Sequence, residues 1–482
     1  MSSILFIALP LLFGFATPIL STFGKNGLVF ASTLMQVFLL YLAFSLVSSS
    51  ESYIEMISIA PPLGISFVLN KASLFFVTLF TFLMVIFSLY YLVHRKTDAY
   101  ENETKFFILL NMLLASAIGL VLSSDIFNIY VFFEIAGISA YILTAYKKTP
   151  SALESGIKYL ITGAVASVFL IFAIVLIYIN IGSLNLAVIS LSFETLPYNL
   201  KVLISILLLI GFGFKVEIFP LNFWVTDVYQ GSSSLIDALF SGIAGKAYLF
   251  VFFHILYLFI PSGEFSVFLI YLGAISMLVA EIAGLKQTNL KRLFAYSSLG
   301  QVALIFTAFA MQNTDAIQGA LFIAFAHSIA KVIIFLALTT IKKEYRNFDI
   351  EILKKLNSPF LRAIMLIAML SLLGIPLFAG FIGKFLVLKS LGVAGMITVL
   401  FIIIIASLLE AVYYFKLIGF MFEKGKREET INISFTQKFV FSLLAVLLIL
   451  VGVAPFVISG FLHESATILL DSKTYVDMLV GV

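Results

Sequence analysis

Long apolar runs separated by short polar clusters make up most of this chain. A membrane-spanning helix needs about 20 predominantly apolar residues, and runs of that length recur throughout the sequence. This pattern predicts an all-α integral membrane protein with about fourteen transmembrane helices. We place these spans at 4–20, 27–47, 72–93, 106–122, 126–146, 159–181, 202–229, 234–259, 266–285, 293–311, 316–340, 360–391, 394–421 and 437–461.

The seventh run, 202–229, and the twelfth, 360–391, are too long for one straight crossing. Each contains a proline, Pro220 and Pro376, and proline breaks the helical hydrogen-bond ladder. Broken spans in matching positions predict two inverted five-helix repeats with broken seventh and twelfth helices. The predicted segments are a three-helix N-terminal segment at 1–105, a first repeat of spans four to eight at 106–260, a second repeat of spans nine to thirteen at 261–421, and the last span with its tail at 422–482.

The basic residues alternate between the two ends of the predicted helices. Cytoplasmic loops carry an excess of lysine and arginine, and most of the 29 basic residues fall in the odd-numbered loops. We therefore expect a multi-pass protein of a prokaryotic cell membrane, with both termini on the non-cytoplasmic side. The odd-loop cations are Lys25, Arg95, Lys96, Lys105, Lys147, Lys148, Lys158, Lys286, Lys291, Arg292, Lys342, Lys343, Arg346, Lys354, Lys355, Arg362, Lys424, Lys426, Arg427 and Lys438.

Composition supports a lipid environment and excludes several kinds of chemistry. Hydrophobic residues make up 62% of the 482 and charged residues 11%, whereas a soluble domain has roughly a quarter charged residues. The absence of cysteine excludes disulfides, thiolate metal sites and iron–sulfur clusters in this chain. Because its four histidines are far apart in the sequence, we expect no metal or cofactor site. The loops account for the net charge of +4, so no nucleic-acid partner is expected.

Several titratable side chains fall deep inside predicted spans. A charge at the centre of a membrane helix costs about 2.5–3.5 kcal/mol on insertion scales, so function is the better explanation for most of them. The structural alternatives are a buried ion pair or a side chain that snorkels to the surface, as we expect for Lys416 near a charged loop. The deep groups are Lys215, Lys246, His327, Lys331 and Lys384.

The spacing of these groups indicates a pathway for ions. His327 and Lys331 are four residues apart, so they share one helix face. Lys215 and Lys384 each lie close to a predicted helix break, where a water-filled cavity can satisfy freed backbone groups. We therefore predict a chain of buried groups that pass protons to one another.

Glu134 is the carboxylate that we expect to tune Lys215. Burial disfavours the charged form of a lysine, and a nearby carboxylate favours it. A carboxylate that approaches or leaves the ammonium would switch the lysine between holding and releasing its proton. Secondary candidates for the pathway are Asp125, Glu217, His254 and Glu410.

Six segments, taken in order, resemble one known family. They are SSDIFNIYVFFEIAGISAYILTAY, KYLITGAVASVFLI, GFKVEIFPLNFWVTDVY, LKQTNLKRLFAYSSLGQVALI, AFAHSIAKVIIFLAL and SLLGIPLFAGFIGKFLVLKS. They resemble the antiporter-like subunits shared by respiratory complex I (NADH:quinone oxidoreductase), energy-converting membrane-bound hydrogenases and multisubunit Na⁺/H⁺ antiporters. The likeness extends from about residue 60 to 420.

The resemblance implies a role for each matching position. Glu134 matches the glutamate that partners the seventh-span lysine, Lys215. Lys246 matches the eighth-span lysine that relays protons towards the middle of the subunit. The central polar pair is His327 and Lys331, and Lys384 matches the twelfth-span group at the outlet. The implied relay runs from Lys215 through Lys246 and the central pair to Lys384.

The resemblance also implies a function and partners. The chain is expected to be a proton-translocating subunit, with Na⁺ as the open alternative, of a respiratory-type oxidoreductase such as a complex I-like dehydrogenase or a membrane-bound hydrogenase. It would be a translocase subunit with no redox site or cofactor of its own. Partner subunits would carry iron–sulfur clusters or other redox centres. Other membrane subunits, including homologous antiporter-like ones, would surround it in the lipid bilayer.

Some positions depart from the family pattern. Asn222 replaces a titratable histidine, Thr226 replaces a second helix-breaking proline, and Asn289 replaces an acidic residue. His254 stands where the family often has arginine. These changes keep two alternatives open: a subunit of a multisubunit Na⁺/H⁺ antiporter without redox chemistry, and a structural paralogue with an inactive ion path. Because the sequence ends soon after the fourteenth span, we also expect a middle or smaller paralogue without a long lateral helix.

Overall fold

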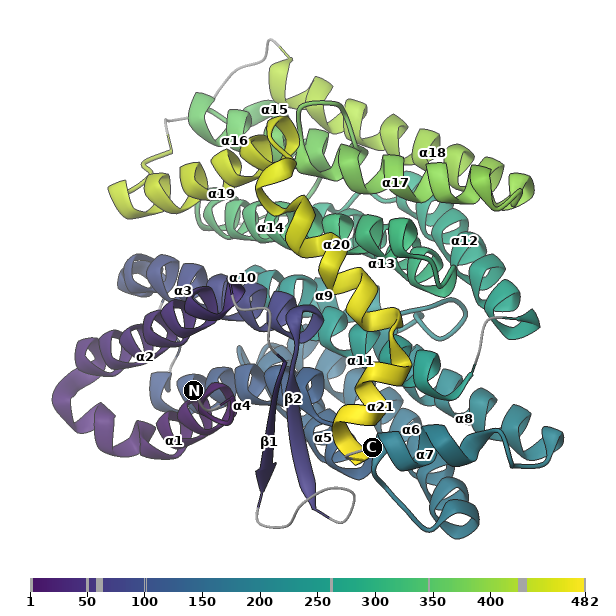
Figure 1. Cartoon of the computed structure of the whole chain (residues 1–482). Helices are drawn as coiled ribbons and strands as arrows, with labels where there is room; N and C mark the ends of the chain where they lie inside the picture. Colours follow the sequence, from purple (N-terminus) through teal and green to yellow (C-terminus); the bar gives the residue numbers. More distant parts are fainter. Residues whose placement is uncertain are drawn as a thin grey trace.

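A computed structural model describes residues 3–48, 52–57, 64–98, 100, 102–260, 263–345, 347–423 and 431–480 of the chain. Figure 1 shows a bundle of helices with a single two-stranded hairpin among these residues. Four basic residues predicted in cytoplasmic loops lie outside the described residues: Arg346, Lys424, Lys426 and Arg427. The side chains of two more, Lys25 and Lys96, are also outside the described part.

Helices follow the predicted spans along the whole chain. Within the described residues, twelve helices are long and apolar enough to cross a membrane, and shorter apolar helices complete the predicted set, so the predicted fold class is confirmed. The helices of the first half are α1 (Leu5–Leu20), α2 (Gly24–Val47), α3 (Lys71–Asp98), α4 (Glu103–Leu122), α5 (Ile126–Thr144), α6 (Pro150–Ile181), α7 (Leu186–Phe193), α8 (Tyr198–Val216), α9 (Val225–Gly231), α10 (Ser234–Leu239) and α11 (Gly245–Phe259).

Local sequence signals set many of the helix ends. Helix α6 begins where the Thr149 side chain accepts a hydrogen bond from the backbone of Ala152, with Pro150 at its first position, and it ends at Gly182 with φ of 78°. The helices of the second half are α12 (Glu264–Leu285), α13 (Leu290–Ala310), α14 (Thr314–Tyr345), α15 (Ile352–Lys355), α16 (Pro359–Leu373), α17 (Ala379–Val393), α18 (Ile397–Phe422), α19 (Phe435–Val453), α20 (Phe456–Leu470) and α21 (Ser472–Val480).

The seventh and twelfth spans are broken, as predicted. Helix α8 ends at Val216 and α9 resumes at Val225, while α16 ends at Leu373 and α17 begins at Ala379. Both first halves end in a left-handed residue, Glu217 with φ of 65° and Gly374 with φ of 75°. A break at membrane depth frees backbone carbonyls for other donors.

One backbone contact recurs in both predicted repeats. Asp125, just before α5, forms an isolated β-bridge with Asn185, between α6 and α7. Asn289, just before α13, forms the same bridge with Asp349, between α14 and α15. Each bridge joins two residues that are the same number of positions apart in the sequence. Five predicted spans separate the first residue of one bridge from the first residue of the other. This correspondence supports the inverted repeat.

The loops gather at two opposite ends of the bundle. Tyr146 donates a hydrogen bond to the carbonyl of Asn102, and Asn289 pairs with Asp349. All four belong to odd-numbered loops, and we call this end the basic face. Even-numbered loops meet at the other end, the hairpin face, where Ser66 lies 2.6 Å from Ser124, Asp125 bridges Asn185, and Gln312 donates to Ser266. This alternation agrees with the predicted count of spans.

Two features at the hairpin face differ from the predicted fold. Strands β1 (Tyr53–Ile57) and β2 (Ile65–Leu69) form an antiparallel hairpin where only a loop was expected. The predicted last span at 437–461 was also wrong at its end. Helix α19 stops at Val453, because Pro455 cannot continue its hydrogen-bond ladder.

Helices α20 and α21, which follow Pro455, run across the bundle as a strap, drawn in yellow in Figure 1. The strap packs on α3, α14 and α7. Lys71 at the start of α3 forms an ion pair with Glu464 of α20. On the central helices, Gln318 donates to the backbone carbonyl of Ser459. The strap therefore joins the N-terminal segment to both predicted repeats.

Candidate functional site: a buried polar axis

Lys215 lies in the last turn of α8, and its side chain is only 2% exposed. Its Nζ donates a hydrogen bond to the hydroxyl of Tyr141, at 2.6 Å. The same ammonium lies 4.4 Å from the ring centre of Tyr141 and 4.7 Å from that of Tyr159. Aromatic faces attract a cation through their negative quadrupole. An aromatic cage therefore holds this charge inside the bundle.

Two glycines make room for the Lys215 ammonium. A Cβ at Gly137 of α5 would lie 3.3 Å from Nζ, and a Cβ at Gly163 of α6 would lie 3.1 Å from it. At Gly163 the added carbon would also lie 1.7 Å from the Tyr141 hydroxyl oxygen. Larger residues would thus displace the hydroxyl that accepts the hydrogen bond of the ammonium.

Glu134 sits one helical turn before Gly137 on the same face of α5. Among the described contacts, no ion pair joins it to Lys215, whose hydrogen-bond partner is Tyr141 instead. Sequence reasoning missed Tyr141, because one tyrosine among 20 in an apolar chain carries no signal of its own. The tuning role of Glu134 stays a prediction, and it would act from about one turn away.

Lys246 follows a π-helical turn, η2 (Phe240–Ala244), that interrupts the eighth span. Its Nζ bends back to donate to the carbonyl of Ser241, and it lies 2.7 Å from Nδ1 of His327 on α14. The Nε2 of His327 is buried without a partner. Single π-helical turns occur frequently at functional sites. After this turn, the Lys246 side chain points towards the imidazole of His327.

Between Lys215 and Lys246 the connection is indirect. The ring of Tyr248, two residues beyond Lys246, lies 5.6 Å from the Lys215 ammonium. Glu217 is buried in the break after α8, and its Oε1 lies 3.9 Å from the position of a Cβ at Gly245. Glu217 therefore reaches the start of α11, beside Lys246. A proton crossing this gap needs bridging water.

Lys331 lies one turn beyond His327 on α14 and is fully buried. Its Nζ donates to the carbonyl of Phe294 and to the hydroxyl of Ser297, both at 2.8 Å and both on α13. Ser297 lies 2.5 Å from the hydroxyl of Tyr414 on α18. Ser297 therefore lies beside Lys331 within the bundle.

Gln301 and Glu410 continue the axis one turn further along α13 and α18. Gln301 donates to Glu410 at 2.7 Å and to the carbonyl of Leu372 at 3.1 Å. The second carboxylate oxygen of Glu410 pairs with Nζ of Lys384 at 2.8 Å. Lys384 also donates to the carbonyl of Leu373, which the broken twelfth span leaves free. Glu410, a secondary candidate in the sequence, is thus the direct carboxylate partner on the axis.

The axis passes through α8, α11, α14, α13, α18 and α17, and these helices come from both predicted repeats. Its groups are amines, an imidazole, hydroxyls, an amide and a carboxylate, all able to donate or accept protons or hydrogen bonds. The structure brings all five predicted deep groups together along this line. Such an arrangement can move a proton between neighbours without exposing a charge to lipid.

Two secondary candidates lie away from the axis. The Asp125 side chain accepts a hydrogen bond from the backbone of Asn128 and caps α5. Burial raises the pKa of this carboxyl, while the donated N–H groups oppose that shift. The His254 ring stacks on Phe250 and meets Tyr475 of the strap edge-on, with ring centres 4.7 Å apart. Both residues therefore have structural partners near the hairpin face.

Two further positions that the sequence singled out have structural explanations. Asn289 caps α13 by accepting from the backbone of Lys291. The prediction that Lys291 is a loop cation was wrong, because its side chain is 1% exposed and pairs with Asp237 of α10. Lys416 is exposed near Phe420, in agreement with a snorkelling side chain.

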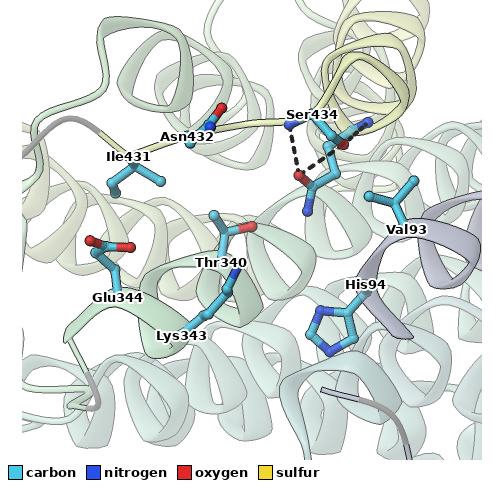
Figure 2. A pocket seen from close by; sticks show the side chains of 9 residues that line it. Val93, His94, Thr340, Lys343, Glu344, Ile431, Asn432 and Ser434 are labelled. Carbon is cyan, nitrogen blue, oxygen red and sulfur yellow. Dashed lines mark hydrogen bonds between the residues drawn. The ribbon is translucent and has the colours of Figure 1, made fainter. Parts of the chain in front are cut away.

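A polar cavity of about 250 Å³ opens at the basic face between α3, α14 and the start of α19. Figure 2 shows His94, Thr340 and Lys343 around it, beside the cap that Ser434 forms with Gln437. None of its lining residues belongs to the axis. Within the described residues, no cluster of three or more histidine or acidic side chains could hold a metal ion.

Comparison with known proteins decides the family. The family model described as NADH:quinone oxidoreductase/Mrp antiporter, transmembrane, matches residues 123–410. The chain belongs to this family. It is 30% identical over 401 residues to NADH-quinone oxidoreductase subunit N of Flavobacterium psychrophilum, covering 81% of this chain and 87% of the relative. The corresponding subunit N of Bacillus anthracis is 28% identical over 397 residues, covering 78% of each chain.

Solved structures agree with the family. A chain of the membrane-bound sulfane sulfur reductase, an archaeal respiratory membrane complex, matches with a TM-score of 0.94 and 30% identity over 99% of both chains. A chain of respiratory complex I from Thermus thermophilus matches at 0.79 and 25% identity, over 95% of this chain and 99% of that one. A chain of the Mrp complex from Dietzia matches at 0.90 and 19% identity over 99% of both, which shows the shared fold.

Proposed function

We propose that this chain is a proton-translocating subunit of a multi-subunit respiratory membrane complex. The relatives and structural neighbours are subunits of complexes of that kind. The observation that carries the proposal is the buried axis. Lys246 contacts His327, and Lys331 lies one turn on and donates to Ser297. One further turn along α13, Gln301 contacts Glu410, which pairs with Lys384. The redox centres would belong to partner subunits, and homologous membrane subunits would pack beside this one.

In the proposed direction, protons enter from the basic face, which we assign to the cytoplasm from its excess of lysine and arginine. They pass along the axis by successive protonation of neighbouring amines and leave at the hairpin face. Electron transfer in the partners would move charge at one end of the axis. The change would spread because each group's proton affinity depends on the charge of its neighbour.

Protons suit this axis better than Na⁺. A protonated lysine offers three donors and no lone pair, so it repels a metal cation and cannot bind it. Among the described axis groups that the sequence predicts, four are lysines and one is a histidine. We therefore expect transport to persist in Na⁺-free buffer. Transport that stops when Na⁺ is removed would favour the antiporter alternative.

Lys215→Ala and Lys246→Ala test the proposal in inverted membrane vesicles. Substrate-driven acidification should be lost in both variants, because each removes a proton-carrying group, while the amount of assembled complex on native gels stays unchanged. Lys416→Ala removes an exposed lysine away from the axis and should behave as the unchanged protein. Equal loss of assembled complex in the two axis variants would favour a scaffold without transport.

A further inference from the structure

A second buried charge pair lies beside the axis but is not part of it. The Nζ of Lys291, at the start of α13, is 2.8 Å from the carboxylate of Asp237 on α10. Both side chains are buried, at 1% and 0% exposed. Lys291 also donates to the carbonyl of Ser232 at 2.6 Å, and the hydroxyl of Ser232 donates to Asp237. The two charged groups thus bond to each other and to Ser232.

Stability alone is a weak reason for such a pair. Removing two charges from water costs about as much as their attraction returns, and apolar replacements of similar volume are often neutral or stabilising. A membrane protein built mostly from apolar residues has simpler ways to join α10 to α13. The position of Asp237 and Lys291 in the fold suggests a second purpose.

Towards the axis, Asp237 lies nine residues before Lys246 in the same predicted span, and no described contact joins the two side chains. Asp237 lies four residues before Ser241, and the carbonyl of Ser241 accepts a hydrogen bond from the Lys246 ammonium. The π-helical turn η2 lies between the two charges and widens the helix there. A backbone carbonyl of this turn, that of Gly242, accepts from Ser328 on α14. Asp237 is therefore the carboxylate on the same helix as the second axis lysine, on its basic-face side.

Towards the surface, one aromatic ring separates the pair from an exposed cation. The Lys291 ammonium lies 5.5 Å from the ring centre of Phe348, and the Lys342 ammonium lies 5.2 Å from the same ring. Lys342 is exposed at the end of α14, at the basic face. The contacts thus run inwards from the surface in the order Lys342, Phe348, Lys291 and Asp237. The gap from Asp237 to Lys246 has no direct contact among the described residues and needs bridging water.

We propose that Asp237 and Lys291 form a proton-entry branch that connects the basic face to Lys246. A proton that arrives from the surface binds the Asp237 carboxylate. Asp237 then passes this proton to the neutral amine of Lys246 through intervening water and returns to its ion pair with Lys291. One proton enters and one leaves in each cycle. This inference rests on the proposed function, because the branch serves the axis.

Neutralising both partners separates transport from structure. In the double variant Asp237→Asn with Lys291→Met no unpaired charge is left buried, so the complex should assemble. Acidification of inverted vesicles should nevertheless slow by about 100-fold, the lower end of the effect of a positioned proton-transfer group. If the pair only joins α10 to α13, the double variant will transport as fast as the unchanged protein, and the proposal is overturned.

Two further variants serve as controls for the double variant. Asp315→Asn removes a carboxylate from the exposed ion pair with Lys389 and should leave the rate unchanged. Lys246→Met tests the axis itself: if it abolishes transport and the double variant does not, the branch is wrong and the proposed function stands. If Lys246→Met also transports normally, the proposed function fails.

An infrared measurement provides a readout independent of turnover. In the assembled complex, a pH step should change the carbonyl stretch of a protonated carboxyl group. The double variant Asp237→Asn with Lys291→Met should lack this signal, because an amide cannot take up the proton. An identical difference spectrum for the variant and the unchanged protein would overturn the assignment of Asp237 as the group that receives the proton.

Discussion

Individual residues show how an apolar bundle accommodates several charges. Lys215 is held by aromatic faces and one hydroxyl, and Lys331 by a carbonyl and a serine hydroxyl. In the axis, only Lys384 among the described lysines has a carboxylate, Glu410, as its direct partner. Neutral partners stabilise an ammonium less firmly than a carboxylate does. Among the described residues, Lys215, Lys246 and Lys331 therefore have no counter-charge in direct contact.

Gly163→Ala tests the cage around Lys215. The added carbon would lie 1.7 Å from the Tyr141 hydroxyl oxygen, so the ring must move and its hydrogen bond to Lys215 must lengthen. We expect a stability loss of about 1–3 kcal/mol and a clear loss of vesicle acidification. Gly419→Ala is the matched control, because nothing lies within 4 Å of a Cβ there. Normal acidification in Gly163→Ala would contradict the role of the cage.

Glu410→Gln tests the one carboxylate that contacts an axis lysine directly among the described residues. Glutamine can keep the hydrogen bond to Gln301, but it leaves the Lys384 ammonium buried without its counter-charge. Breaking a buried pair in this way costs about 3–5 kcal/mol, so the thermal midpoint of the purified complex should fall. Adding Lys384→Met should restore the midpoint without restoring transport. A midpoint unchanged by Glu410→Gln alone would show that the pair carries little stability.

At the level of the elements, periodicity and proline predict the helices and their two breaks. The sequence could not show the π-helical turn, because Phe240–Ala244 has no composition that distinguishes it from the surrounding helix. It also missed the hairpin of β1 and β2, whose strands are short apolar runs like many others in the chain. Single-residue spacing placed His327 next to Lys331, but the partners Ser297 and Tyr414 come from other helices and needed the fold.

Deletion of Gly242 tests the π-helical turn. Removing one residue would let an ordinary α-helix form in place of the i→i+5 turn. The Ser241 carbonyl would then join the regular helical hydrogen-bond ladder in place of its contact with Lys246. We expect an assembled complex with strongly reduced acidification of inverted vesicles. Full acidification after the deletion would show that the turn has no part in aiming Lys246.

For the whole molecule, the strap ties distant parts together at the hairpin face. Its helices bury leucines against the bundle, and they cover the ends of α3, α14 and α7. Burying one leucine contributes about 1.5–3 kcal/mol. Ending the chain after Val453 should therefore lower the thermal midpoint by several degrees while the axis remains intact. The check is a thermal unfolding curve of the truncated protein, and an unchanged midpoint would contradict the account.

The axis crosses the boundary between the two predicted repeats where Lys246 contacts His327. The fourteen-span pattern, the buried lysines and the family could all be predicted from the sequence, because long apolar runs and charges inside them are rare signals. The proposed entry branch of Asp237 and Lys291 could not be predicted, because Lys291 follows a loop and resembles an ordinary surface cation in the sequence. Its burial follows from how α10 and α13 pack, which periodicity does not reveal.

The most direct test of the central claim is the number of protons moved per electron pair when Lys331 is replaced by methionine. Lys331 is the fully buried amine that lies between His327 and the Glu410–Lys384 pair. Methionine keeps its length without a titratable group. The account predicts that the assembled variant complex moves fewer protons per electron pair than the unchanged complex. An unchanged ratio at a normal rate would contradict a proton path along this axis.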